Sequence, residues 1–193
     1  MFVILLNMKK QLNIKIPKNV SGNISPNNIE IKGKLGQLSL NKKEQFNCEL
    51  DIQKNILVCS FIKDTYLIKK QLSYLTKQYV QFITNLRTNL KGVSNGFLIE
   101  LKLVGVGYRF LSYKENILVM KVGFCNNISF EVPDEITIFL ESPTQITLFS
   151  IDYLLVKQTA ASLRSFRRPD AYKGKGFQYL SEVLVLKEVK KNG

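Results

Sequence analysis

The chain of 193 residues is long enough for one domain or two small ones, and its 45% hydrophobic residues can supply a folded core. Lysine and arginine number 28 against 15 acidic residues, which gives a formal net charge of +13. Such a chain repels itself unless a polyanion neutralises it. Nucleic acid is therefore the first expected partner and an anionic membrane surface the second.

The residue types that most catalytic sites need are missing. The sequence has no histidine, which removes the usual general base, every histidine-dependent triad and most catalytic zinc sites. Its three cysteines, Cys48, Cys59 and Cys125, are too widely spaced for a zinc knuckle, and their odd number argues against a disulfide framework. We therefore expect a reduced compartment, no metal, no cofactor and no enzymatic activity.

No membrane insertion or targeting signal is predicted. The apolar opening at residues 2–6 is far shorter than the roughly 20 residues of a spanning helix. Neither a secretory signal nor an arginine-containing amphipathic presequence is visible. Abundant Ile, Asn, Lys and Phe are typical of an AT-biased genome. We expect an organelle-encoded protein of the mitochondrial matrix, with a plastid or the bacterial cytoplasm as alternatives.

Residues 1–11 are interpreted as an N-terminal extension and residues 12–92 as a first domain. Alternating apolar and polar residues predict short antiparallel strands with one solvated face, and residues 34–36 predict a hairpin turn. The expected strands cover residues 12–16, 29–32, 38–40 and 55–62.

A long amphipathic helix is expected to close this domain. Asp64 or Thr65 can cap its start, and Gly92 is the predicted stop. Spacings of three and four predict one buried stripe. The stripe consists of Ile68, Leu72, Leu75, Tyr79, Phe82, Leu86 and Leu90.

Residues 93–187 are predicted to form a second domain, followed by a basic tail at residues 188–193. A second helix is expected over residues 151–167, before Pro169. The expected strands cover residues 99–103, 117–124, 128–132, 136–140, 145–149 and 179–187. Strands followed by a helix, given twice, indicate an α+β fold of two similar small domains, each an antiparallel sheet packed against a helix.

The strongest chemical signal lies on the second predicted helix and the loop after it. At 3.6 residues per turn, Lys157, Arg164 and Arg168 lie within about 40° of one another. The paired guanidinium donors of arginine, the ammonium charge of lysine and the main-chain N–H groups of glycine all bind phosphate oxygens well. Tyr172 can stack on a base or ribose. The predicted RNA-binding residues are Lys157, Arg164, Arg167, Arg168, Tyr172, Lys173, Gly174, Lys175 and Gly176. The alternative is a solvated basic face with Tyr172 packed on the sheet.

Three other patterns only partly match known motifs. Residues 105–107 begin like a dinucleotide fingerprint, but Phe110 occupies the third glycine position and the context predicts a strand. Residues 174–176 lack the spacer and hydroxyl residue of a phosphate-binding P-loop. Residues 175–180 partly resemble an RNA-recognition strand, but Gln178 replaces its small residue.

Residues 163–179 closely resemble the signature of the family of large-subunit ribosomal protein six. Within them, the sequence Tyr-Lys-Gly-Lys-Gly at residues 172–176 follows arginine and proline. Further likenesses to this family lie at residues 14–17, 31–36, 89–97 and 104–109. The resemblance therefore extends over nearly the whole chain, in order.

The resemblance implies a non-enzymatic constituent of the large ribosomal subunit that binds large-subunit rRNA and supports translation. The second domain is then expected near the sarcin–ricin loop and the stalk base. Its expected partners are neighbouring large-subunit proteins, with translational GTPases nearby. The implied rRNA contacts are Arg164, Arg167, Arg168, Tyr172, Lys173 and Lys175, with Gly174 and Gly176 shaping the loop. Gly105, Gly107, Tyr108 and Arg109 are interpreted as its scaffold.

The chain departs from the family pattern at residues 124–127 and 149–153, and Phe177 stands where an aliphatic residue is common. With the AT bias, this divergence favours a mitochondrial member. Outside the family, the alternatives are a non-ribosomal RNA-binding module and a peripheral binder of anionic membrane. Salt-sensitive binding to RNA rather than vesicles excludes the membrane binder, and residence in the large subunit excludes the free module.

Overall fold

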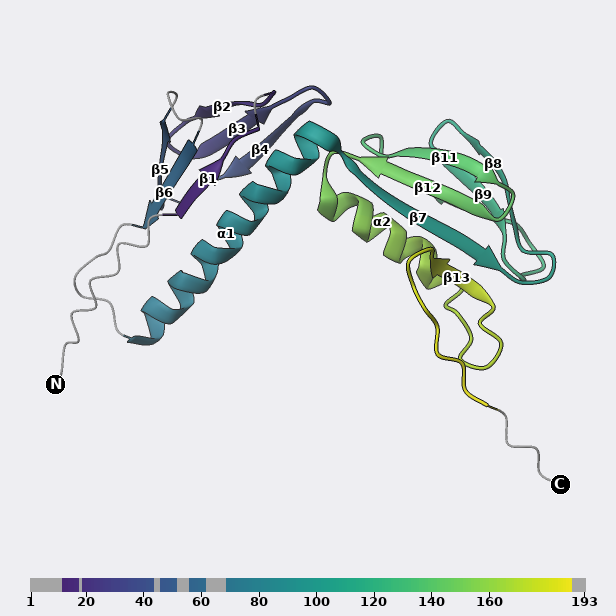
Figure 1. Ribbon diagram of the computed structural model, residues 1–193. Coiled ribbons are helices and arrows are strands. Elements are labelled where there is room, and N and C mark those ends of the chain that lie inside the picture. The colour runs from purple at the N-terminus through teal and green to yellow at the C-terminus, as the bar shows by residue number, and fades with distance from the viewer. Residues whose placement is uncertain (1–11, 18, 44–45, 52–55, 62–68, 189–193) are drawn as a thin grey trace. The chain divides into compact units, whose positions relative to one another are not determined.

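The computed structural model of the chain describes residues 12–17, 19–43, 46–51, 56–61 and 69–188. The contacts divide it into two compact units, Met1–Asn95 and Gly96–Gly193. Each unit combines a helix with antiparallel sheets (Figure 1), which confirms the predicted α+β class. Within the described residues, no helix is both long and apolar enough to cross a membrane.

The first unit contains two three-stranded antiparallel sheets and one long helix. One sheet has the order β1 (Leu12–Lys15), β6 (Ile56–Phe61), β5 (Phe46–Asp51). The other has the order β2 (Ser21–Ile24), β3 (Asn28–Lys32), β4 (Gln37–Asn41). The hairpin predicted at residues 34–36 is confirmed, because β3 and β4 pair antiparallel on either side of it.

Helix α1 (Lys69–Asn95) carries the predicted apolar stripe. The buried members are Leu75, Tyr79, Phe82, Leu86 and Leu90, joined by Ile83 and Val93. Phe46 of β5 packs against Tyr79 and Phe82, with ring centroids 5.5 and 5.2 Å away. The expected caps Asp64 and Thr65, and the side chains of Ile68 and Leu72, lie outside the described part of the chain.

The predicted helix stop at Gly92 is wrong. Helix α1 continues beyond it, and the chain turns at Gly96, whose φ of 72° lies in the left-handed region of helix-ending glycines. Val93 explains the difference, because its side chain is fully buried in contact with Gly33. Its carbonyl also accepts a hydrogen bond from the N–H of Leu35 at 3.4 Å. This packing outweighs the roughly 1 kcal/mol that a glycine costs inside a helix.

The second unit contains two antiparallel sheets and helix α2 (Tyr153–Phe166). The four-stranded sheet has the order β11 (Thr137–Ser142), β12 (Gln145–Ser150), β7 (Phe97–Val104), β13 (Gly176–Tyr179). The three-stranded sheet has the order β10 (Ile128–Glu131), β9 (Ile117–Lys121), β8 (Arg109–Lys114). Strand β7 is central in the larger sheet, with β12 on one side and β13 on the other.

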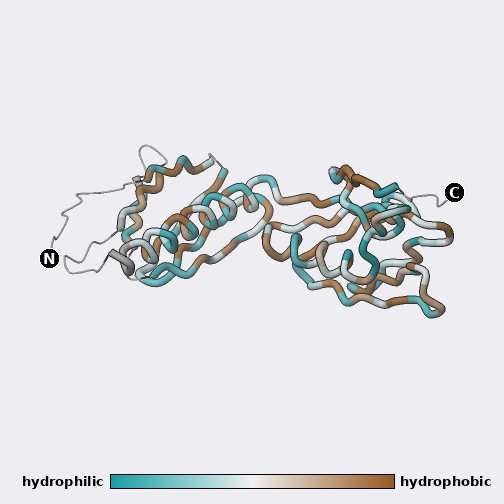
Figure 2. The backbone as a smooth tube through the Cα atoms, turned by 90° about the horizontal axis from the view of Figure 1, so that it is seen from below, coloured by the Kyte–Doolittle hydropathy of each residue, from teal (hydrophilic) through white to brown (hydrophobic). Residues whose placement is uncertain are grey.

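Amphipathic elements enclose the core of the second unit. Val156, Ala160 and Leu163 of α2 are fully buried, together with Leu101 and Phe177 of the sheet. Figure 2 shows apolar and polar residues alternating along the chain, as elements with one buried face require. Asp152 caps the helix, because its carboxylate accepts a hydrogen bond from the N–H of Leu154 at 2.8 Å.

The predicted strand at residues 179–187 is wrong. Strand β13 ends at Tyr179, and one further ladder bond joins the N–H of Leu180 to the carbonyl of Glu100 at 3.1 Å. The chain then turns, so that Val183 and Val185 are 90% and 92% exposed. Their alternation with polar residues imitates a strand, but no strand lies beside them in the described residues. The prediction also missed β2, β5 and β8.

Candidate nucleic-acid interface

The loop between α2 and β13 closes on itself through Asp170. The Asp170 N–H donates to the carbonyl of Lys175 at 3.0 Å, and its own carbonyl accepts from the N–H of Gly174 at 2.9 Å. Its carboxylate accepts from the N–H of Lys173 at 3.0 Å. Gly174 has a φ of 65°, which glycine adopts without steric cost. The basic side chains of this loop are thus carried on a preorganised backbone.

Gly176 brings the end of α2 against the start of β13. Its φ is 139°, and a Cβ added here would lie 2.6 Å from the carbonyl oxygen of Arg168 and 2.7 Å from that of Arg167. The next residue, Phe177, donates its N–H to the carbonyl of Arg167 at 2.9 Å. Only a residue without a side chain allows this approach, which sets the two arginines beside Lys175.

Arg167, Arg168 and Lys175 form the cationic cluster of the second unit. They line a cavity of about 530 Å³ together with Ser165, Tyr108, Phe166 and Asp170. The cluster does not follow the predicted helical face. The helix ends at Phe166, and Arg167 takes an extended backbone with φ −150° and ψ 90°. Arg168 therefore does not lie on the helical face that was predicted for it together with Lys157 and Arg164.

Tyr108 forms part of the cavity wall and is held between two glycines. A Cβ at Gly105 would lie 2.6 Å from the Tyr108 ring, and one at Gly123 would lie 2.6 Å from its hydroxyl. Both glycines have positive φ, 153° and 85°. The sequence predicted a scaffold role for Tyr108 and did not predict Ser165 as a lining residue. The pairing of β13 with β7 brings Tyr108 to the loop, and no local signal reveals this.

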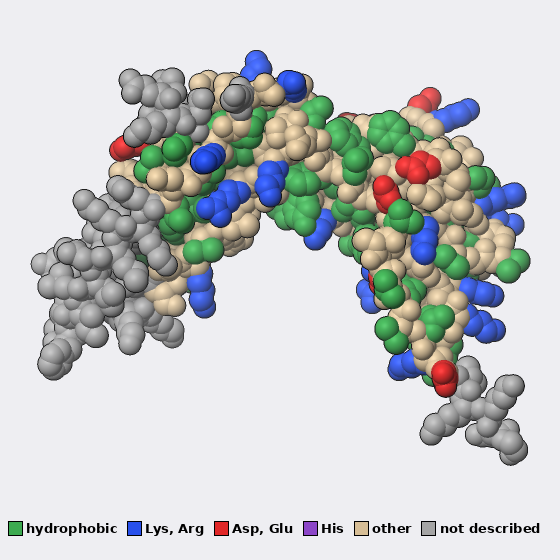
Figure 3. Space-filling view, in the orientation of Figure 1, with side chains coloured by type: hydrophobic (Ala, Val, Ile, Leu, Met, Phe, Trp, Pro, Cys, Tyr) green, Lys and Arg blue, Asp and Glu red, His purple; other side chains and the backbone are tan. Residues whose placement is uncertain are grey.

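The remaining loop residues lie at the surface. The side chain of Tyr172 is 52% exposed, so it is not packed on the sheet as the alternative interpretation required. Lys173 and Lys175 are also exposed, whereas Gly174 and Gly176 are buried. Figure 3 shows lysine and arginine side chains along one edge of the second unit, with few acidic side chains beside them. This arrangement offers positive charge and a free aromatic face to a polyanion.

Arg164 lies apart from the cationic cluster. Its guanidinium donates to the carboxylate of Glu182 at 2.7 Å, and its carbon lies 5.1 Å from the centroid of the Tyr179 ring. The side chains of the pair are 27% and 25% exposed. The positive charge of Arg164 is therefore neutralised within the chain, and its main contact is with the segment that follows β13.

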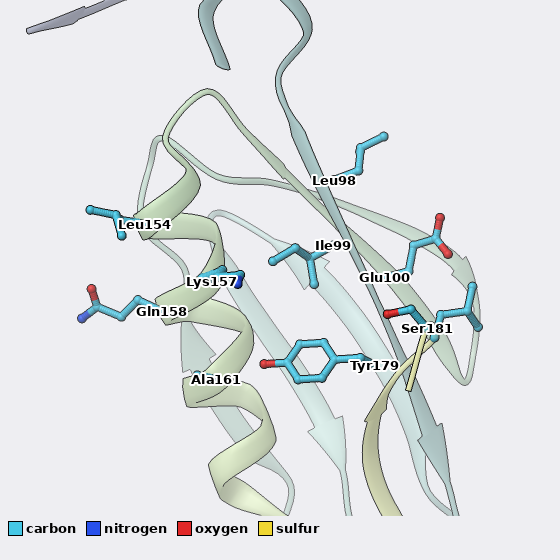
Figure 4. Close-up of a pocket in the computed structure, with 10 residues that line it drawn as sticks. Leu98, Ile99, Glu100, Leu154, Lys157, Gln158, Ala161, Tyr179 and Ser181 are labelled. Atoms are coloured by element: carbon cyan, nitrogen blue, oxygen red, sulfur yellow. The ribbon is translucent and has the colours of Figure 1, made fainter. Parts of the chain in front are cut away.

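Lys157 lies in a different cavity, of about 1050 Å³, between α2, the first half of β7 and residues 179–181 (Figure 4). Its Nζ lies 4.8 Å from the centroid of the Tyr153 ring. A hydrogen bond to the Tyr153 side chain raises the pKa of Lys157 above its usual value. The walls include Leu98 and Leu154, which are exposed apolar residues. Lys157 is thus a charged group in a largely apolar groove, separate from Arg167 and Arg168.

Within the described residues, no group of three or more His, Cys, Asp or Glu side chains could hold a metal ion. The family model for ribosomal protein L6 matches residues 104–180, which include Tyr108 and the whole loop from α2 to β13. The matched residues lie within the second unit, and the family they match is one of ribosomal proteins.

Similar proteins extend the match over both units. Large ribosomal subunit protein uL6m of Reclinomonas americana is 38% identical, over 92% of this chain and 95% of the relative. The uL6 protein of Mycoplasmoides gallisepticum is 36% identical, over 90% of this chain and 91% of the relative. That of Paramagnetospirillum magneticum is 32% identical, over 92% and 95%. The chain belongs to the uL6 family of large ribosomal subunit proteins.

Proposed function

We propose that the chain is a structural constituent of the large ribosomal subunit whose second unit binds rRNA phosphates. The observation that carries the proposal is the convergence of Arg167, Arg168 and Lys175 on one cavity. An arginine guanidinium can donate two hydrogen bonds to phosphate oxygens, and a lysine ammonium adds a point charge. The protein has no reaction to catalyse in this role; it neutralises backbone charge and fixes the position of an RNA segment.

The loop supports this role because the carboxylate of its one acidic residue, Asp170, is hydrogen-bonded to the loop backbone. The Asp170 carboxylate accepts a hydrogen bond from the main-chain N–H of Lys173, so its charge is engaged inside the loop. Lys173 and Tyr172 project from the loop surface. We assign Lys173 to a further phosphate and Tyr172 to stacking on a ribose or base.

Two of the predicted RNA-binding residues receive different roles in this proposal. Arg164 acts as a positioning residue that holds the segment after β13 through Glu182. Lys157 contributes long-range attraction from its own groove rather than a contact in the cluster. The resemblance to the uL6 family further supports an rRNA site near the sarcin–ricin loop and stalk base, with neighbouring large-subunit proteins and translational GTPases close by.

The test is the salt dependence of binding to a large-subunit rRNA fragment that contains the sarcin–ricin loop. Each phosphate neutralised contributes about 0.9 to the slope of log affinity against log salt concentration for duplex nucleic acid. Arg168→Gln and Lys175→Gln should each reduce the slope by about 1, uniformly across RNA sequences.

Arg87→Gln provides the matched control, because Arg87 is an exposed arginine on α1 of the first unit. It should leave the slope nearly unchanged. Equal slopes for wild type, Arg168→Gln and Lys175→Gln would refute the proposed site. Binding to anionic vesicles that outcompetes the RNA would refute the RNA partner.

We also propose that the protein works in a mitochondrial ribosome. A mitochondrial uL6m is among the most similar relatives, and the AT-biased composition supports an organellar gene. Sedimentation of a mitochondrial extract under a high-salt wash tests this. The protein should comigrate with the large subunit and lose that position after ribonuclease treatment; absence from the mitochondrial fraction would contradict the compartment.

A further inference from the structure

Two thiols face each other inside the first unit. Cys48 of β5 and Cys59 of β6 are direct cross-strand partners in the antiparallel ladder. Their Sγ atoms are 3.2 Å apart, in hydrogen-bond contact. Cys59 is fully buried and Cys48 is 8% exposed. Neither the family assignment nor the rRNA site gives these residues a role.

The cross-strand register of the two cysteines suits a disulfide. Directly opposed residues of antiparallel strands have Cα atoms about 4.5–5.5 Å apart, and disulfides need about 4.4–6.8 Å. Bond formation requires the sulfur separation to shorten from 3.2 Å to about 2.05 Å.

The surroundings make the two thiols unequal. The hydrogen bond shared with Cys59 lowers the pKa of the Cys48 thiol, and the nearby positive charge of Lys42 lowers it further. The same hydrogen bond, together with burial, raises the pKa of Cys59. Cys48 is also the member that retains solvent access. Cys48 is thus the nucleophile of the pair, and Cys59 remains a protonated thiol beside it.

We propose that Cys48 and Cys59 form a modification site that hydrogen peroxide oxidises to an intramolecular disulfide. In the first step, the Cys48 thiolate attacks the peroxide oxygen, the O–O bond breaks, and protonation gives a sulfenic acid and water. In the second step, the Cys59 sulfur attacks the sulfenic sulfur, the S–O bond breaks, and a second water leaves with the Cys59 proton. Both sulfurs are oxidised and the peroxide is reduced, so electrons and atoms balance.

The burial of the pair favours a small oxidant. Cys48 is 8% exposed, which favours an oxidant as small as hydrogen peroxide over the active site of a protein oxidant. The third cysteine, Cys125, is exposed and lies in the second unit. The sequence holds only three cysteines, so Cys125 has no intramolecular partner in its unit. Its expected products are oxyacids or a bond between two molecules.

The test oxidises the full native chain with hydrogen peroxide, blocks the remaining thiols with iodoacetamide and maps peptides by mass spectrometry. A peptide pair that joins Cys48 to Cys59, two hydrogen atoms lighter than the reduced pair and lost on reduction with dithiothreitol, is expected. Cys125→Ser should leave its yield unchanged, and Cys48→Ala or Cys59→Ala should abolish it. Circular dichroism checks that the alanine variants fold.

The same treatment in urea tests whether the native fold directs the pairing of Cys48 with Cys59. In the unfolded chain the three thiols should pair with less selectivity, whereas the native chain should yield the Cys48–Cys59 bond alone. Recovery of both cysteines as alkylated thiols or single oxyacids from oxidised native protein would overturn the proposal. This outcome is independent of the proposed function, which assigns rRNA binding to residues of the second unit.

Discussion

The guanidinium of Arg164 and the carboxylate of Glu182 are joined at 2.7 Å, which links the last turn of α2 to the segment that follows β13. The carboxylate also accepts the N–H of Tyr179 at 3.4 Å, and the Tyr179 ring lies under the arginine. Arg164 thus contacts both a charge and an aromatic face of its own chain. The sequence had predicted Arg164 as an RNA-binding residue.

Removal of this ion pair should destabilise the second unit. Arg164→Ala and Glu182→Gln are each expected to lower the free energy of unfolding by about 1 kcal/mol, because the pair is partly exposed and loses one charged hydrogen bond. Urea unfolding of both single variants and the double variant measures the coupling. Strictly additive losses would show that the pair is not coupled. RNA affinity should fall less for Arg164→Ala than for Arg168→Gln.

Gly176→Ala should be strongly destabilising. The new methyl group would lie 2.6 and 2.7 Å from two main-chain oxygens that cannot rotate away, at a φ of 139°. We expect a loss of about 2–3 kcal/mol in the free energy of unfolding. Gly107→Ala is the matched control, because Gly107 also has positive φ, 76°, but meets no atom within 4 Å. Its expected loss is about 1 kcal/mol, and equal losses would contradict the steric explanation.

Leu163→Ala should expose the dependence of α2 on its buried face. Leu163 is fully buried, and its truncation is expected to cost about 2–5 kcal/mol. Leu154 lies on the same helix at 65% exposure, so Leu154→Ala should stay within about 0.5 kcal/mol of wild type. Guanidinium unfolding followed by circular dichroism compares the two. A small effect at Leu163 would contradict the helix register.

The first unit should lose stability in alkaline solution through Tyr79. Burial raises the pKa of Tyr79 to about 12 from 10.0, and the hydroxyl donates to the carbonyl of Cys59 at 2.6 Å. Between these values the unfolded chain ionises while the folded chain keeps its proton. The contribution is therefore fully present below pH 10 and is lost as pH rises toward 12.

Urea unfolding across this pH range measures the effect. Tyr79→Phe should flatten the decline, at the cost of about 1 kcal/mol at neutral pH for the lost hydrogen bond. Tyr74→Phe, at a position 63% exposed on the same helix, should retain the wild-type decline. The same pH slope in Tyr79→Phe and wild type would assign the decline to other groups.

The spacing of apolar residues correctly predicted the buried faces of the two helices. The stripe from Leu75 to Leu90 is buried as expected, and so is the face of Val156 and Leu163, since each needs only a helix and one apolar neighbour. The prediction failed where a tertiary contact decides the outcome. Val93 extends α1 past Gly92, and the polar turn at Glu182 ends the ladder that the alternation beyond Tyr179 suggested.

For the candidate site too, the sequence predicted some features and not others. The loop residues Lys173 and Lys175 were predicted from composition and resemblance, because charge and glycine content are visible in sequence. The neighbourhood of Tyr108 and the partner of Arg164 were not, because both depend on strand pairing between distant segments. Helical spacing also misplaced Arg168, since no local signal marks the extended backbone at Arg167.

The pairing of β13 with β7 joins the segment after α2 to a strand that precedes it by about seventy residues. Strand β7 lies at the centre of its sheet, and its neighbour β13 follows both β12 and α2 in the chain. The cationic cavity needs that pairing, because Gly176 and Lys175 stand at its start. The first unit contains its own helix and sheets. We therefore expect the first unit to fold without any contribution from β13, whereas the cationic cavity forms only once β13 has paired with β7.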